Sequence, residues 1–257
     1  MIQSFDRAMA IATALSSDEH RKWWTINDLA KECQLPVSTI YRLLYTLMKH
    51  GLVEQDTATK QYTLGIKWME FGLRVLDRID YRKVIKPMIE ELAREVNESV
   101  YFSQPSGLES IVVERVDSQH NIRIYDQLGL RIPMHIGAAN KVVLAHMSVE
   151  EARQTVVQLV GEEQVPAFMD KLQEIRAAGH AVSFAERTEN TASVAAPVID
   201  YNQKVIGALS IGIVTYDLKE ERLQYLIERV KDVAHKTSQR LGGLSKAELL
   251  PTIWTEY

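Results

Sequence analysis

The sequence predicts an α+β protein of two domains, a small helical one at the N-terminus and a larger one that mixes helices with strands. The chain has 257 residues, of which 46% are hydrophobic, so it exceeds a typical single domain and can bury a sizeable core. Its first third combines three stretches of helical apolar spacing with one short hairpin. The remainder alternates helices and strands without a regular strand–helix–strand rhythm, which favours a mostly antiparallel sheet flanked by helices.

The first two helices are predicted from capping residues and apolar spacing. Ser4 can cap a helix that ends at the polar run 16–22. Thr25 can cap the second helix, because its hydroxyl can accept a backbone N–H and Asp28 lies three residues further on. Cys33 continues the apolar face of this second helix, so we interpret it as a core residue rather than a redox or ligand group.

A third helix is expected from Pro36, whose ring suits a helix start, to the residues before Gly51, which can end it. One side carries apolar side chains and the other polar and aromatic ones. The apolar side holds Ile40, Leu43, Leu44 and Leu47, and the outward side holds Val37, Ser38, Tyr41, Arg42 and Tyr45. A short hairpin follows, with strands near 52–53 and 62–64 and a polar turn at 56–60.

Helical spacing returns over residues 64–78 and runs into the charged segment 77–83, where we place a linker. Its Trp and Phe side chains can belong to a core or pair with another subunit. Beyond the linker we expect helices at 83–97, 138–147, 149–160, 166–178 and 219–241, and strands at 100–103, 110–116, 121–125, 193–199 and 205–214.

Composition narrows the class of protein. No apolar run approaches the roughly 18 residues that a membrane span needs, and the first residues lack a secretion signal, so we expect a cytoplasmic protein without membrane contact. Cys33 is the only cysteine, which excludes an internal disulfide and a cysteine-rich zinc site. The net charge is −4, but residues 1–75 are slightly basic and the rest is acidic, so the first segment is the better candidate for nucleic acid.

Three helices followed by a hairpin are the arrangement of a winged helix-turn-helix, whose third helix enters the major groove of DNA. Arg42 can bond bidentately to guanine, and hydroxyl groups beside it can reach phosphates or base edges. The predicted DNA-binding residues are Ser38, Thr39, Tyr41, Arg42, Tyr45 and, in the wing, Lys60. The alternative is a solvated surface helix without a partner.

An enzyme needs a nucleophile with a base, paired acids in a pocket or a metal cluster, and none of these emerges. Ser210 lies between glycines in "GALSIG" but lacks the G-x-S-x-G elbow, and no phosphate-binding or dinucleotide-binding glycine loop is present. The seven histidines are scattered without an H-x-x-x-H pair. We therefore predict no catalytic residue, no metal site and no cofactor.

Several segments together resemble the IclR family of transcription regulators. "TINDLAKECQLPVSTIYRLLYTLMKHGLVEQ" and "QYTLGIKWMEFG" resemble its DNA-binding half, with the "sTxyRlLxtL" helix and the "YxLG" that follows the wing. "IPMHIGAANKVVLAHM", "GHAVSFAERTENTASVAAPVID" and "VIGALSIG" have the order and spacing of its effector-binding domain. The resemblance covers nearly the whole chain.

The resemblance implies a GAF-like C-terminal α/β domain that binds a small carboxylic, sugar-acid or aromatic metabolite and adjusts DNA binding in a homodimer or a tetramer. Residue by residue, it implies effector contacts at Gly137, Ala138, Ser183, Ser193, Ser210 and Gly212. Ser183 stands where many members carry an acidic residue, and Gln34 stands at a usual glycine of the helix-turn-helix turn. These departures alter the expected ligand and demand a left-handed backbone at Gln34.

We therefore expect a regulator of a metabolic operon, a repressor or an activator, that binds double-stranded operator DNA under the control of a small-molecule effector. The expected domains are residues 1–63 for DNA binding, 64–82 for a linker helix, and 83–250 for effector binding and oligomerisation. Two alternatives remain: a ligand-independent DNA-binding protein whose C-terminal domain only oligomerises, and a small-molecule enzyme.

Overall fold

The computed structural model describes residues 2–17, 21–77 and 82–242, and it confirms the α+β class. The chain divides into two compact units, Met1–Asp80 and Tyr81–Tyr257, each with its own apolar core. Residues 78–81 of the predicted linker and 243–250 of the predicted C-terminal domain lie outside the described residues. The limits 1–63, 64–82 and 83–250 therefore stay a prediction.

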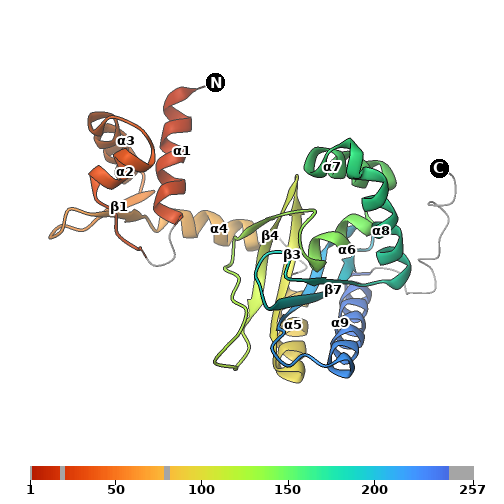
Figure 1. Cartoon of the computed structure of the whole chain (residues 1–257). Coiled ribbons are helices and arrows are strands. Elements are labelled where there is room, and N and C mark those ends of the chain that lie inside the picture. The colour runs from red at the N-terminus through yellow and green to blue at the C-terminus, as the bar shows by residue number, and fades with distance from the viewer. Residues whose placement is uncertain (1, 18–20, 78–81, 243–257) are drawn as a thin grey trace. The chain divides into compact units, whose positions relative to one another are not determined.

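The first unit contains the three predicted helices, the hairpin and the helix that the spacing over residues 64–78 predicted (Figure 1). These elements are α1 Gln3–Ser16, α2 Ile26–Glu32, α3 Val37–Lys49, β1 Val53–Gln55, β2 Tyr62–Leu64 and α4 Lys67–Asp77. Their core gathers Ile11, Leu29, Ile40, Leu44 and Val53, with Cys33 packed against it as predicted. Burial raises the pKa of the Cys33 thiol, which keeps it protonated.

The start of α2 and the turn between α2 and α3 have the hydrogen bonds and backbone conformation that were expected. The Thr25 hydroxyl accepts the Asp28 N–H at 3.2 Å and so caps α2. Gln34 adopts φ 52°, a left-handed conformation that glycine would adopt with less strain. Pro36 precedes α3 as its N-cap and accepts the Ile40 N–H at 3.1 Å. The turn therefore sets α3 against the core despite the missing glycine.

The second unit is built on one antiparallel sheet, as predicted. Its strands are β3 Ser99–Ser106, β4 Glu109–Val116, β5 Arg131–Pro133, β6 Ala181–Phe184, β7 Thr191–Ile199 and β8 Val205–Val214. Their spatial order is β5-β4-β3-β8-β7-β6, and every neighbouring pair runs antiparallel. The central strands β3 and β8 therefore come from opposite ends of this unit.

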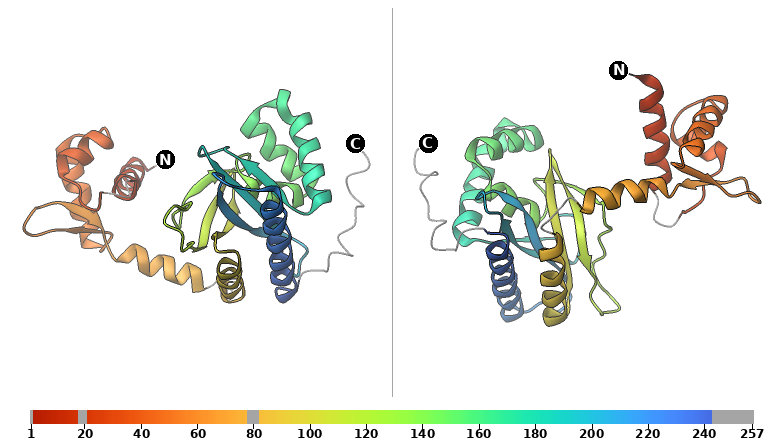
Figure 2. Two further views of the ribbon diagram at one scale, coloured as in Figure 1. Left: turned by 60° about the horizontal axis from the view of Figure 1, so that its bottom comes forward. Right: turned by 180° about the vertical axis from the view of Figure 1, so that it is seen from behind.

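Helices cover both faces of this sheet (Figures 1 and 2). One face carries α5 Arg82–Val96 and α9 Glu220–Arg240, and the other carries α6 Ala138–His146, behind which lie α7 Val149–Val160 and α8 Val165–Ala178. Side chains alternate between the faces along each strand. In β8, Leu209, Ile211 and Ile213 join the α5–α9 core, whereas Ala208 joins the α6 core.

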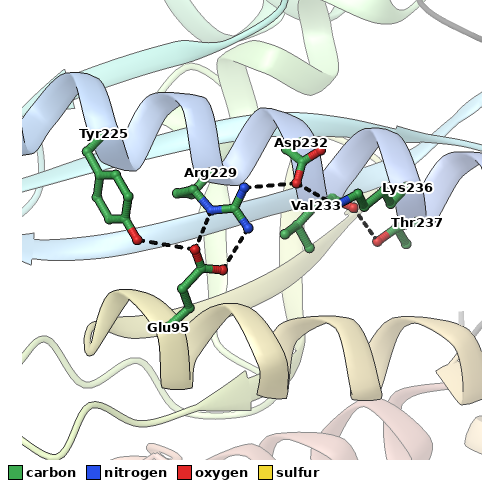
Figure 3. Close-up of polar contacts among 7 residues, drawn as sticks. All are labelled: Glu95, Tyr225, Arg229, Asp232, Val233, Lys236 and Thr237. Carbon is green, nitrogen blue, oxygen red and sulfur yellow. Dashed lines mark hydrogen bonds and ion pairs between the residues drawn. The ribbon is translucent and has the colours of Figure 1, made fainter.

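An ion-pair network joins α5 to α9 (Figure 3). The Arg229 guanidinium meets the Glu95 carboxylate with Nε 2.6 Å from Oε1 and Nη2 2.7 Å from Oε2. The Tyr225 hydroxyl donates to the same carboxylate at 3.2 Å, and Arg229 also pairs with Asp232. The hydrogen bond from Arg229 lowers the pKa of Glu95. The first and last helices of this unit are thereby held side by side.

One strand expected from the sequence is wrong, and two short strands were missed. The strand predicted at 121–125 is wrong, because this segment lies in the irregular connection 117–130 between β4 and β5. Its alternating pattern reflects single side chains: Ile122 is 78% exposed, whereas Ile124 packs beside Gly212 and Tyr101. The short edge strands β5 and β6 were not predicted.

Candidate functional site

The outward face of α3 is as the sequence predicts. Tyr41 and Tyr45 are 60% and 64% exposed, and Ser38 and Arg42 are also exposed, while Thr39 is half-buried. Ile40, Leu44 and Leu47 are buried on the opposite side of the same helix. Among the described residues, none forms an ion pair with Arg42. Its guanidinium is therefore available for an external partner.

The wing beside α3 is a compact hairpin. Trp24 exchanges two backbone hydrogen bonds with Tyr62, at 2.9 and 2.8 Å, which attaches the start of the second helix to β2. At the tip, the Asp56 carboxylate accepts the N–H groups of Ala58 and Thr59 at 2.7 and 2.8 Å. Lys60 follows in a left-handed conformation and is exposed. Its ammonium therefore projects from an ordered turn.

All six residues predicted to contact an effector line one cavity in the second unit. Its wall includes Gly137, Ala138, Ser183, Ser193, Ser210 and Gly212. The register of the sheet explains why these residues lie together. Ser193 of β7 is paired with Ser183 of β6 and with Gly212 of β8. Ser210 precedes Gly212 by two residues and so lies on the same face of β8. Small side chains on this face leave a hollow beneath α6. Their role as effector contacts stays a prediction.

Hydrogen bonds link several of these groups already. The Ser183 and Ser193 hydroxyls lie 2.9 Å apart, and the Ala138 N–H donates to the Ser193 hydroxyl at 3.4 Å. The Tyr101 hydroxyl, on the cavity wall, donates to the Ile124 carbonyl at 2.7 Å. Burial raises the pKa of Tyr101 to about 12, so this hydroxyl keeps its proton at neutral pH.

The cavity also contains charged residues that the sequence reasoning missed. Glu186 and Arg187, from the connection between β6 and β7, line it together with Asp126. Glu186 pairs with Lys141 of α6, and Arg187 pairs with Asp126. No local sequence pattern marks these ion pairs, because the two members of each pair are separated by 45 and 61 residues along the chain. The alternation of small and branched residues along β7 and β8 was the available signal for the cavity itself.

Other kinds of site find no support. In the described part of the chain, no group of three or more His, Cys, Asp or Glu side chains is arranged to hold a metal ion. No helix among the described residues is long and apolar enough to cross a membrane.

Comparison with known proteins adds independent findings. Residues 4–57 match the model described as the IclR helix-turn-helix domain, and residues 73–239 match the model described as the bacterial transcriptional regulator IclR C-terminal domain. The HTH-type transcriptional regulator KipR of Bacillus subtilis is 34% identical over 87% of this chain and 92% of its own length. The glycerol operon regulatory protein of Streptomyces coelicolor is 31% identical over 94% of this chain and 97% of its own.

A solved structure shows the same fold. The IclR homolog from Microbacterium hydrocarbonoxydans, crystallised as a complex with 4-hydroxybenzoate, has a TM-score of 0.78 at 20% identity and covers 93% of this chain and 98% of that one. The matched relatives are named regulators, in agreement with the prediction that this chain is not an enzyme.

Proposed function

The chain belongs to the IclR family of bacterial transcription regulators, and from this premise we propose that it represses a metabolic operon until a small organic effector binds its C-terminal unit. DNA binding follows from the family. The operon, the sign of control and the dependence on an effector are the proposal. Activation in place of repression is the alternative sign. The proposal places the protein in the cytoplasm, where the operator DNA of a bacterium lies.

The observation that carries the DNA-binding part is the two-sided α3. Ile40, Leu44 and Leu47 are buried, whereas Tyr41, Arg42 and Tyr45 are exposed, so the helix can enter a major groove without disturbing its core. Ser38 and Thr39 lie at its N-terminal end, where hydroxyl and N–H groups can hold a phosphate. A homodimer, or a tetramer formed from two dimers, would present two such helices to the half-sites of a near-palindromic operator.

The cavity supports effector control. It places hydroxyl groups and the N-terminus of α6 around one hollow, which suits a small polar ligand held in orientation by a few groups. A related fold has been crystallised with 4-hydroxybenzoate. An effector can change DNA affinity only if it binds the DNA-bound and the free conformation of the protein with different affinities. Operator DNA must then change the affinity for the effector by the same factor.

The test of DNA binding begins with fragments selected from random DNA by the purified protein. We expect a near-palindromic consensus. Arg42→Ala should weaken binding to it by about 1–3 kcal/mol and relax the preference at one base pair of each half-site. Arg153→Ala, which removes an exposed arginine from α7, is the matched control and should leave binding unchanged. Unchanged selectivity in Arg42→Ala would mean that another helix reads the bases.

The test of effector control uses calorimetry with a panel of keto, sugar and aromatic acids, with and without operator. A ligand whose affinity changes on adding operator supports the proposal. Equal affinities would leave a DNA-binding protein without allosteric control. No bound ligand across the panel would favour a C-terminal unit that only oligomerises.

A further inference from the structure

The cavity in the second unit is small and partly open to solvent. Its volume is about 90 Å³, well below the roughly 300–1,000 Å³ of typical small-molecule pockets. The space is reduced by the protein's own side chains, which reach it from two connections, 117–130 and 185–190. A ligand larger than this space therefore has to move side chains or extend into solvent, and the contacts of these two connections indicate which side chain it would move.

The carboxylate of Glu186 occupies the position where an anion would bind. Its Oε2 accepts the Gly137 N–H at 2.8 Å, directly at the start of α6, and its Oε1 pairs with the Lys141 ammonium. A helix N-terminus favours negative charge, and Lys141 adds a full positive charge one turn into the same helix. The Lys141 side chain is only 15% exposed, so losing this partner would leave a largely buried positive charge without a nearby negative one.

The backbone holds this geometry in place. Gly137 has φ 84° and ψ 158°, a conformation essentially confined to glycine, and so directs its N–H at Glu186. Next to Glu186, Arg187 pairs with Asp126 of the other connection. The Arg115 guanidinium donates to the Asp126 carbonyl at 3.0 Å. The two connections are thus fastened to each other across the cavity.

We propose that Glu186 is an internal occupant of the effector site, and that a carboxylate effector binds by exchanging with it at the Gly137 N–H and the Lys141 ammonium. This inference rests on the proposed function and deepens it. Addition without exchange would bring two carboxylates to one ammonium in a confined space, which is unfavourable. Exchange releases the segment 185–190, and with it the Arg187–Asp126 pair. A neutral ligand would leave both in place.

Acetate is the probe, because it is the smallest carboxylate that mimics the end of the Glu186 side chain. In Glu186→Ala the site is vacated, so about 100 mM sodium acetate should raise the Tm by about 2 °C more than sodium chloride of equal ionic strength. The wild type should show no such difference, because its own carboxylate competes. Glu189→Ala, which removes an exposed glutamate from the same segment, is the matched control.

Two further measurements separate exchange from a general effect of salt. Lys141→Met combined with Glu186→Ala should abolish the acetate response. Hydrogen exchange in residues 185–190 should be faster in Glu186→Ala and in Glu186→Gln than in the wild type. Equal acetate responses in wild type and Glu186→Ala, or none in either, would overturn the proposal. Operator binding without ligand is measured separately, so this failure is distinct from a failure of the proposed function.

Discussion

The two candidate sites differ in how their polar side chains are satisfied before any partner arrives. On α3, Arg42 and Tyr45 extend from a rigid helix into solvent, and among the described residues Arg42 has no ion-pair partner. Around the cavity, Glu186 and Arg187 are already paired with Lys141 and Asp126. The proposed DNA-binding surface is therefore preformed, whereas the proposed effector site would have to exchange internal contacts for external ones.

This difference predicts how substitutions divide between stability and binding. Changes on the outward face of α3 should alter affinity for DNA and leave folding almost unaffected, since exposed side chains contribute little to stability. Changes around the cavity should alter both, because the same groups hold the unit together. Substitutions made in each unit can sharpen or break the contrast between the two units.

The largest effect is expected when a glycine is replaced by alanine in each unit. Gly137→Ala should lower the free energy of unfolding by about 1–3 kcal/mol, because alanine is strained at φ 84° and ψ 158°. Gly72→Ala in α4 should instead raise it by about 0.5–1 kcal/mol, because its new methyl group meets nothing within 4 Å and alanine favours a helix. Urea denaturation followed by circular dichroism measures both, and changes of the same sign would remove the contrast.

Acid should affect the second unit before the first. Burial lowers the pKa of His146 to about 4 from 6.5, while its Nδ1 lies 2.8 Å from the Val142 carbonyl. The unfolded chain therefore takes up a proton first, and stability falls as the pH drops from about 6.5 towards 4, by on the order of 2 kcal/mol. His146→Gln should remove this loss, as measured by urea denaturation at pH 7, 5.5 and 4.5.

Among the described residues of the first unit, the lowered pKa values belong to carboxyl groups. Hydrogen bonds from the Thr25 hydroxyl and from the Thr59 N–H lower the pKa values of Asp28 and Asp56, respectively. Their contribution to stability is present above about pH 3.8 and lost below it. Asp56→Asn should therefore leave the profile between pH 6.5 and 4.5 unchanged. A loss of the acid response in Asp56→Asn would contradict the assignment to His146.

The smallest effect is expected at the tip of the wing. Lys60 is exposed and should contact a phosphate, so Lys60→Ala should weaken binding to all DNA sequences alike and reduce the slope of log K against log salt by about 1. Fluorescence anisotropy over a range of salt concentrations measures this slope. Lys171→Ala, at an exposed lysine of α8, is the control. A sequence-dependent loss in Lys60→Ala would assign a base contact to the wing.

The sequence predicted those elements whose signals are local. Helix α7 and strand β8 have the predicted limits, because a Ser148 cap and an uninterrupted run of apolar and small residues mark them. The segment 121–125 was wrongly predicted as a strand. Its two-residue alternation arises because one side chain, Ile124, inserts into the cavity from an irregular connection. Strands β5 and β6 are three and four residues long, too short for a pattern.

The two sites were not equally predictable. The outward face of α3 follows from helical periodicity alone. The six cavity residues were named through a family resemblance, and the pairing of Glu186 with Lys141 depends on how α6 packs against the end of β6. Contacts of that kind need the tertiary structure, because neither residue type nor spacing distinguishes Glu186 from its exposed neighbour Glu189.

The network that joins α5 to α9 also bears on how the protein is made. Glu95 meets Arg229 across 134 residues, and β3 pairs with β8, so the second unit completes its sheet and helix layer only when its last helix has left the ribosome. The core of the first unit draws on residues from Ile11 to Tyr62 and can form much earlier. A chain whose translation stops before α9 therefore carries a folded first unit, with α3 in place, on an incomplete second unit.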